Sequence, residues 1–147
     1  MRCKSMVAVA AFFPAVLWLA PMAMGAPFCR QKDFEGVWNV YAMGSGEWGP
    51  WWQACKMVVG RDGKIKDGEC TDSMGDKSPI VGGAVNLSRN CLLSGEFKFK
   101  DVEEGIVFTA TINHGTLEHA KQMAAGVGKN DNAQIFNFTA IRQPKNK

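Results

Sequence analysis

Apolar and polar residues alternate along most of the chain after residue 33, with the period of two that is typical of strands with one buried face. The pattern is clearest in Cys91–Lys100, where Leu93, Phe97 and Phe99 share a face with Cys91. Short polar or Gly-rich turns separate the alternating segments. The predicted strands are Phe34–Met43, Trp51–Val59, Ile65–Cys70, Ile80–Leu87, Cys91–Lys100, Gly105–Asn113 and Ala133–Arg142.

One stretch leaves two interpretations open. Leu117, Lys121 and Ala124 have helical spacing, which predicts a short helix over Leu117–Ala125. The same residues could form a loop that leads into a further strand over Lys121–Val127. The strand count is therefore seven or eight.

Short turns between consecutive strands favour antiparallel neighbours, and no long helical pattern exists to cover a parallel sheet. Strands with one apolar face each must bury it, either by closing the sheet or by packing two sheets together. We therefore predict an all-β fold, an antiparallel up-and-down barrel of about eight strands, with a two-sheet β-sandwich as the alternative.

The first 26 residues have the pattern of a secretory signal peptide. Arg2 and Lys4 precede an apolar core at Val7–Leu19, and small residues follow up to Ala26. We expect a signal peptide at 1–26, one domain at 27–147, and a secreted or periplasmic mature protein without a membrane span. Removal of the two leader cations from a total of 17 leaves 15 basic against 14 acidic residues, a balance that gives no electrostatic footprint for nucleic acid.

Four cysteines follow the leader, and an even number in an exported domain predicts disulfides. A four-residue turn at Arg61–Lys64 would place Gly60 opposite Ile65 and Cys55 opposite Cys70. We expect the pairs Cys55–Cys70 and Cys29–Cys91.

The segment Phe34-Glu35-Gly36-Val37-Trp38 resembles the Gly-x-Trp signature on the first strand of lipocalins, avidins and related calycin barrels. That resemblance implies a small barrel in which the Trp closes one end and a ligand enters the other. This chain departs from those families in its second predicted disulfide and in lacking a Thr-Asp-Tyr segment.

Aromatic residues concentrate in Phe34–Cys55, beside Gly46, Gly49 and Pro50. Aromatic rings on a loop can stack on flat ligands or anchor a protein partner, and they can equally plug the barrel. If the second strand is extended, Trp51 and Trp52 point to opposite faces, so at most one of them is a core residue. The candidate ligand-binding residues are Trp48, Trp51, Trp52 and Tyr41.

Catalytic and metal-binding patterns are weak. His114 and His119, with Glu118, lack a third histidine and are interpreted as solvated loop residues. No cofactor, metal site or catalytic residue is predicted, and the protein is expected not to be an enzyme.

The preferred functional hypothesis is a non-catalytic binding barrel for a small apolar or aromatic-stacking ligand. The alternative is a protein-interaction or inhibitor module that uses the Trp-rich loop and has no ligand cavity. An enzyme, which needs a polar cleft around the histidines, and an outer-membrane barrel rank below these.

Overall fold

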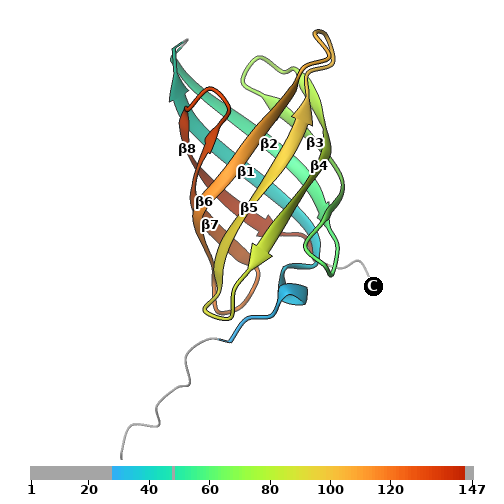
Figure 1. Cartoon of the computed structure of the whole chain (residues 1–147), viewed down its shortest axis with the longest axis vertical. Coiled ribbons are helices and arrows are strands. Elements are labelled where there is room, and N and C mark those ends of the chain that lie inside the picture. The colour runs from blue at the N-terminus through green and yellow to red at the C-terminus, as the bar shows by residue number, and fades with distance from the viewer. Residues whose placement is uncertain (1–27, 48, 145–147) are drawn as a thin grey trace, which may run out of the picture.

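Eight antiparallel strands close into a barrel in the computed structural model, which describes residues 28–47 and 49–144 (Figure 1). Each strand pairs with its neighbours in sequence, and β1 pairs with β8 to complete the closure. A short 3-10 helix, η1 (Gln31–Phe34), precedes the barrel. The strands are β1 (Gly36–Gly46), β2 (Gly49–Val59), β3 (Ile65–Asp72), β4 (Lys77–Leu87), β5 (Leu92–Lys100), β6 (Val107–Leu117), β7 (Met123–Asn130) and β8 (Ile135–Arg142).

This topology confirms the up-and-down barrel, and the two-sheet alternative is wrong because a single sheet closes on itself. The helix considered over Leu117–Ala125 is also wrong: β6 continues to Leu117 and β7 begins at Met123. Pairing with neighbouring strands outweighs the weak helical spacing there. The proposed signal peptide at 1–26 and residue 27 lie outside the described residues. Within the described part, the four-residue η1 is the longest helix, and no helix could cross a bilayer.

The two ends of the barrel differ. At the open end, drawn at the top of Figure 1, hairpins join β1 to β2, β3 to β4, β5 to β6, and β7 to β8. The opposite, closed end carries the other three turns and η1. Alternate residues of every strand point inward, so the interior is built from apolar side chains. Trp38, Val40 and Ala42 are the buried inward residues of β1, as the alternation predicts.

The closed end is plugged by Phe34 of η1. Its ring stacks on that of Trp38, with centroids 4.3 Å apart, and the Trp38 indole N–H donates a hydrogen bond to the Phe34 carbonyl at 3.0 Å. The Arg142 guanidinium lies over the Trp38 ring, 4.7 Å from its centroid. Burial lowers the pKa of Arg142, and the charges of Asp33 and Glu35 oppose that shift. The Trp of the Gly-x-Trp segment thus closes one end of the barrel.

Two disulfides hold the barrel, and both predicted pairs are confirmed. Cys29–Cys91 ties the segment before η1 to the turn between β4 and β5. Cys55–Cys70 joins directly opposed residues of β2 and β3, whose Cα atoms are 3.9 Å apart.

The turn that joins β2 to β3 differs from the prediction in the pairing of its first residues. The ladder shifts between Val58 and Val59, so Ile65 pairs with Val59 and not with Gly60. One extra residue on β3 forms a bulge there, beyond the disulfide, so the opposition of the cysteines is preserved. A second register shift lies in β4, between Ile80 and Gly82.

Candidate functional site

A cavity of about 500 Å³ opens at the open end of the barrel. We call it the open-end cavity. Its volume is within the usual range for small-molecule sites, about 300–1,000 Å³. Its lining residues come from strands on opposite sides of the barrel and from three of the open-end hairpins. They are Gly46, Gly49, Pro50, Trp51, Trp52, Gln53, Asp72, Ser73, Met74, Phe99, Phe108, Asn130, Asn132 and Gln134.

Aromatic rings form two opposing walls of this cavity. On one wall Phe99 of β5 and Phe108 of β6 are stacked, with ring centroids 5.8 Å apart. The other wall is formed by Trp51 of β2, which packs at a tilt against Phe136 of β8, with centroids 6.2 Å apart. Phe136 itself is buried and borders the small cavities beneath. In a closed eight-strand barrel, β5 and β6 lie across the interior from β1 and β2. A flat apolar ligand between the walls would therefore contact rings on both sides.

Two polar groups beside these rings have no hydrogen-bond partner among the described residues. The side-chain amide of Gln53 makes no hydrogen bond with any described residue, although it borders the open-end cavity and both small cavities beneath it. The Trp51 indole N–H is buried and also lacks an acceptor within the described part of the chain. An amide that can both donate and accept would orient a polar atom of a ligand.

The register of β2 and β3 places Gln53 directly opposite Asp72. The Cys55–Cys70 disulfide lies two residues deeper on the same inward face, so it holds this pair in place. Asp72 Oδ1 accepts hydrogen bonds from the N–H groups of Met74 and Asp76, at 2.8 and 3.0 Å. These bonds shape the hairpin between β3 and β4 at the edge of the cavity.

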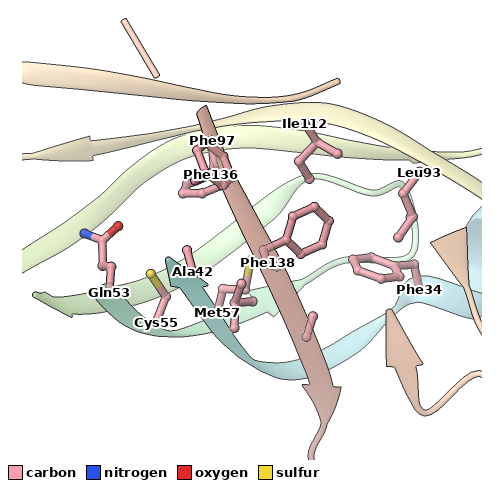
Figure 2. Close-up of a pocket in the computed structure, with 12 residues that line it drawn as sticks. Phe34, Ala42, Gln53, Cys55, Met57, Leu93, Phe97, Ile112, Phe136 and Phe138 are labelled. Atoms are coloured by element: carbon pink, nitrogen blue, oxygen red, sulfur yellow. The ribbon is translucent and has the colours of Figure 1, made fainter. Parts of the chain in front are cut away.

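Below the open-end cavity the barrel interior is nearly filled. Figure 2 shows the rings of Phe97, Phe136 and Phe138 projecting into it, with Gln53 towards one end and Phe34 towards the other. Two cavities of about 20 Å³ each remain there, room for about one water molecule apiece. Among the described residues, the inside of the barrel therefore offers a ligand of ordinary size space at its mouth and not deeper.

The structure separates the predicted ligand-binding residues. Trp51 points inward and joins the site, whereas Trp52 is 48% exposed and lines the outer margin of the cavity. This arrangement agrees with the expectation that at most one of the two is a core residue. Tyr41 is 51% exposed on the outside of β1, because it alternates with the inward-facing Val40 and Ala42. Trp48 lies outside the described residues.

The sequence prediction missed other lining residues, among them Gln53, Asp72, Phe99, Phe108 and Asn130. The alternation of inward and outward residues in the sequence could have identified some of them. Phe99, for example, shares the inward face of its strand with Phe97 and comes next to last before the turn. The inward residues nearest the open end of every strand could have been grouped once the barrel was assumed.

The histidines do not form a site. His114 on β6 and His119 in the following turn are both exposed, as expected for solvated residues. Among residues 28–47 and 49–144, no group of three or more His, Cys, Asp or Glu side chains could hold a metal ion.

Comparisons with known proteins identify the architecture. No protein-family model matches the chain, and no curated protein matches its sequence. Among solved structures, it is similar to mFAP1, a redesigned β-barrel bound to DFHBI, with a TM-score of 0.60 and 14% identity over 76% of this chain and 97% of that one. The redesigned barrel mFAP0, also bound to DFHBI, gives a TM-score of 0.54 and 17% identity over 75% and 99%. A fluorescence-activating barrel designed de novo gives a TM-score of 0.51 and 12% identity over 77% and 96%.

At these identities the likeness shows the fold alone. The chain has the architecture of small closed barrels, which is the part of the calycin resemblance that the structure supports. Membership of a calycin family stays a prediction.

Proposed function

We propose that the protein binds a small, flat apolar or aromatic molecule in the open-end cavity and catalyses no reaction. The observation that carries this proposal is the pair of aromatic walls, Trp51 on one side and Phe99 stacked with Phe108 on the other, beside the unpaired amide of Gln53. Stacking on two walls supplies affinity, and one amide supplies orientation.

The barrel comparisons are consistent with this function. Two of the similar structures hold the small molecule DFHBI, and they share only the architecture with this chain. The two disulfides fit an oxidising compartment, so we place the binding protein outside the cytoplasm as a secreted or periplasmic protein.

Native mass spectrometry of the full-length gene product, purified from the compartment to which it is exported, tests the proposal. We expect a co-purified small molecule that is lost in Phe99→Ala and Trp51→Ala. Tyr41→Ala is the matched control, because it removes an aromatic side chain from the outer surface. A ligand retained by Phe99→Ala and lost from Tyr41→Ala would contradict the proposed site.

A second candidate function rests on a different observation. The interior is nearly filled, and Trp52 and Met74 are exposed at the edge of the open end, Met74 by 82%. Exposed apolar side chains on loops can anchor a protein partner. A consistently ligand-free mass, with a protein captured by the wild type and not by Met74→Asp, would favour this interaction module.

A further inference from the structure

Charged residues are divided between the two ends of the barrel. The open-end hairpins and the strand ends beside them carry seven carboxylates and two lysines: Glu47, Asp72, Asp76, Asp101, Glu103, Glu104 and Asp131, with Lys77 and Lys100. The balance is reversed at the closed end. Its cations are Arg30, Lys32, Arg61, Lys64, Arg89, Lys121 and Arg142, and its carboxylates are Asp33, Glu35, Asp62 and Glu118. The domain is nearly neutral as a whole, but its open end carries a net negative charge and its closed end a net positive charge.

The carboxylates of the open end are not neutralised within the described part of the chain. The ion pairs among all described residues are Lys66–Asp62, Lys77–Glu69, Lys98–Glu96 and Lys121–Asp33. None of them includes a carboxylate of the open end. One of the two lysines at this end, Lys77, is engaged by Glu69. Like charges around one opening add their fields, and the field is strongest where low-dielectric walls exclude water.

The lining of the open-end cavity is negatively charged, like the hairpins around it. Asp72 is the one charged side chain among its described lining residues. It is partly buried and points inward beside Gln53, and no lysine, arginine or histidine of residues 28–47 and 49–144 lines the same space. Asp72 Oδ1 is used by the hairpin, whereas Oδ2 has no hydrogen-bond partner among the described residues.

We propose that the open-end cavity selects an organic cation, a molecule with a flat aromatic body and a positively charged nitrogen. This inference rests on the proposed binding function and names its ligand class. Aromatic faces attract cations as well as apolar bodies, so Trp51, Phe99 and Phe108 serve both parts of such a ligand. Asp72 supplies the opposite charge, and the surrounding carboxylates raise the local concentration of cations. An anion of the same shape gains the stacking but is repelled by Asp72 and by the other carboxylates, which outnumber the two lysines at this end.

Three probes of similar shape and different charge test the selection: N-methylacridinium, neutral acridine at mildly alkaline pH, and anthracene-9-carboxylate. Binding to the full mature protein is measured by calorimetry and by quenching of tryptophan fluorescence. We expect N-methylacridinium to bind about tenfold more tightly than acridine at low ionic strength. Added salt should reduce that preference, and the carboxylate should bind most weakly.

Substitution of Asp72 identifies the charge responsible. Asp72→Asn keeps the Oδ1 acceptor that the hairpin needs and removes the charge, so it should weaken N-methylacridinium by about fivefold and acridine by much less. The double variant Glu103→Gln/Glu104→Gln, which does not touch the cavity lining, should reduce the salt dependence. Glu35→Gln is the matched control, because it removes a carboxylate at the closed end.

Equal affinity for the cation and for acridine, or an unchanged cation affinity in folded Asp72→Asn, would overturn the cation inference while leaving the binding function intact. Failure of all three probes to bind, together with a ligand-free native mass, would remove the proposed function as well.

Discussion

The indole of Trp51 lies against Gly44, its directly opposed partner on the neighbouring strand β1. A Cβ atom on residue 44 would lie 2.5 Å from Trp51 Cζ2 and 2.9 Å from the carbonyl oxygen of Ile135. Real Cβ contacts are essentially never closer than 3.0 Å. The missing side chain at position 44 is therefore what allows the indole to lie inside the barrel and form a wall of the open-end cavity.

We expect Gly44→Ala to displace Trp51 and to weaken ligand binding about tenfold, because one aromatic wall is lost. Overpacking should also lower the free energy of unfolding by about 1–3 kcal/mol. Near-UV circular dichroism and urea denaturation measure the two effects. Gly82→Ala is the control, since a Cβ there meets nothing within 4 Å. Unchanged tryptophan signals in Gly44→Ala would show that the ring does not depend on this contact.

The two disulfides should differ in their contribution to stability. Cys29–Cys91 spans 62 residues and Cys55–Cys70 spans 15. Loop-closure entropy predicts about 4 kcal/mol for the longer span and about 3 kcal/mol for the shorter. Urea denaturation of the double variants Cys29→Ala/Cys91→Ala and Cys55→Ala/Cys70→Ala measures each loss.

The shorter disulfide should also matter for binding. It lies beside the opposed pair Gln53 and Asp72, so its removal should weaken ligand affinity, whereas removal of Cys29–Cys91 at the other end should not. Equal losses of affinity in folded forms of both variants would contradict this division.

Acid should weaken the plug at the closed end. The hydrogen bond from Lys121 Nζ, at 2.6 Å, is the main cause that lowers the pKa of Asp33 below its ordinary value of 3.8. A carboxyl whose pKa is lower in the folded state contributes stability above its unfolded-state pKa, and this contribution is lost as the pH falls through the folded-state pKa.

Asp33→Asn should therefore be less stable than the wild type by about 1 kcal/mol near neutral pH, and the difference should disappear as the pH falls below about 4. Urea denaturation across this pH range measures it. Lys121→Gln should show the same convergence, because it removes the partner. A constant difference at all pH values would assign the effect to the shape of η1 rather than to the charge.

The strands were predictable because their alternation is local. Alternation places Trp51 and Trp52 on opposite faces, and the strand pairing shows that Trp51 is the one inside. The same rule puts Tyr41 on the face opposite Trp38, so its inclusion among the ligand residues came from its nearness in sequence to the Trp-rich loop. The plug η1 was not predicted, because Gln31–Phe34 is too short to show any periodicity.

The composition of the site depends on closure of the barrel, which no local pattern shows. Phe99 and Trp51 are 48 positions apart in sequence, and only the pairing of all eight strands brings them around one cavity. The bulge after Val58 was invisible for a related reason, since a single extra residue on β3 leaves the apolar pattern of β2 unchanged.

Truncation of a core side chain tests whether the barrel interior is filled. Phe97 borders both small cavities, and Phe99, its neighbour on the same face of β5, borders the open-end cavity. Phe97→Ala should join the small cavities into one and cost about 3–5 kcal/mol of stability. The enlarged cavity would be lined mainly by apolar side chains and could take up small apolar molecules, so benzene should raise the melting temperature of the variant and not of the wild type. Met43→Ala, which truncates an exposed side chain on β1, is the control. A benzene-induced shift of the same size in the wild type would show that its interior already admits ligands, and the binding site would then extend below the mouth.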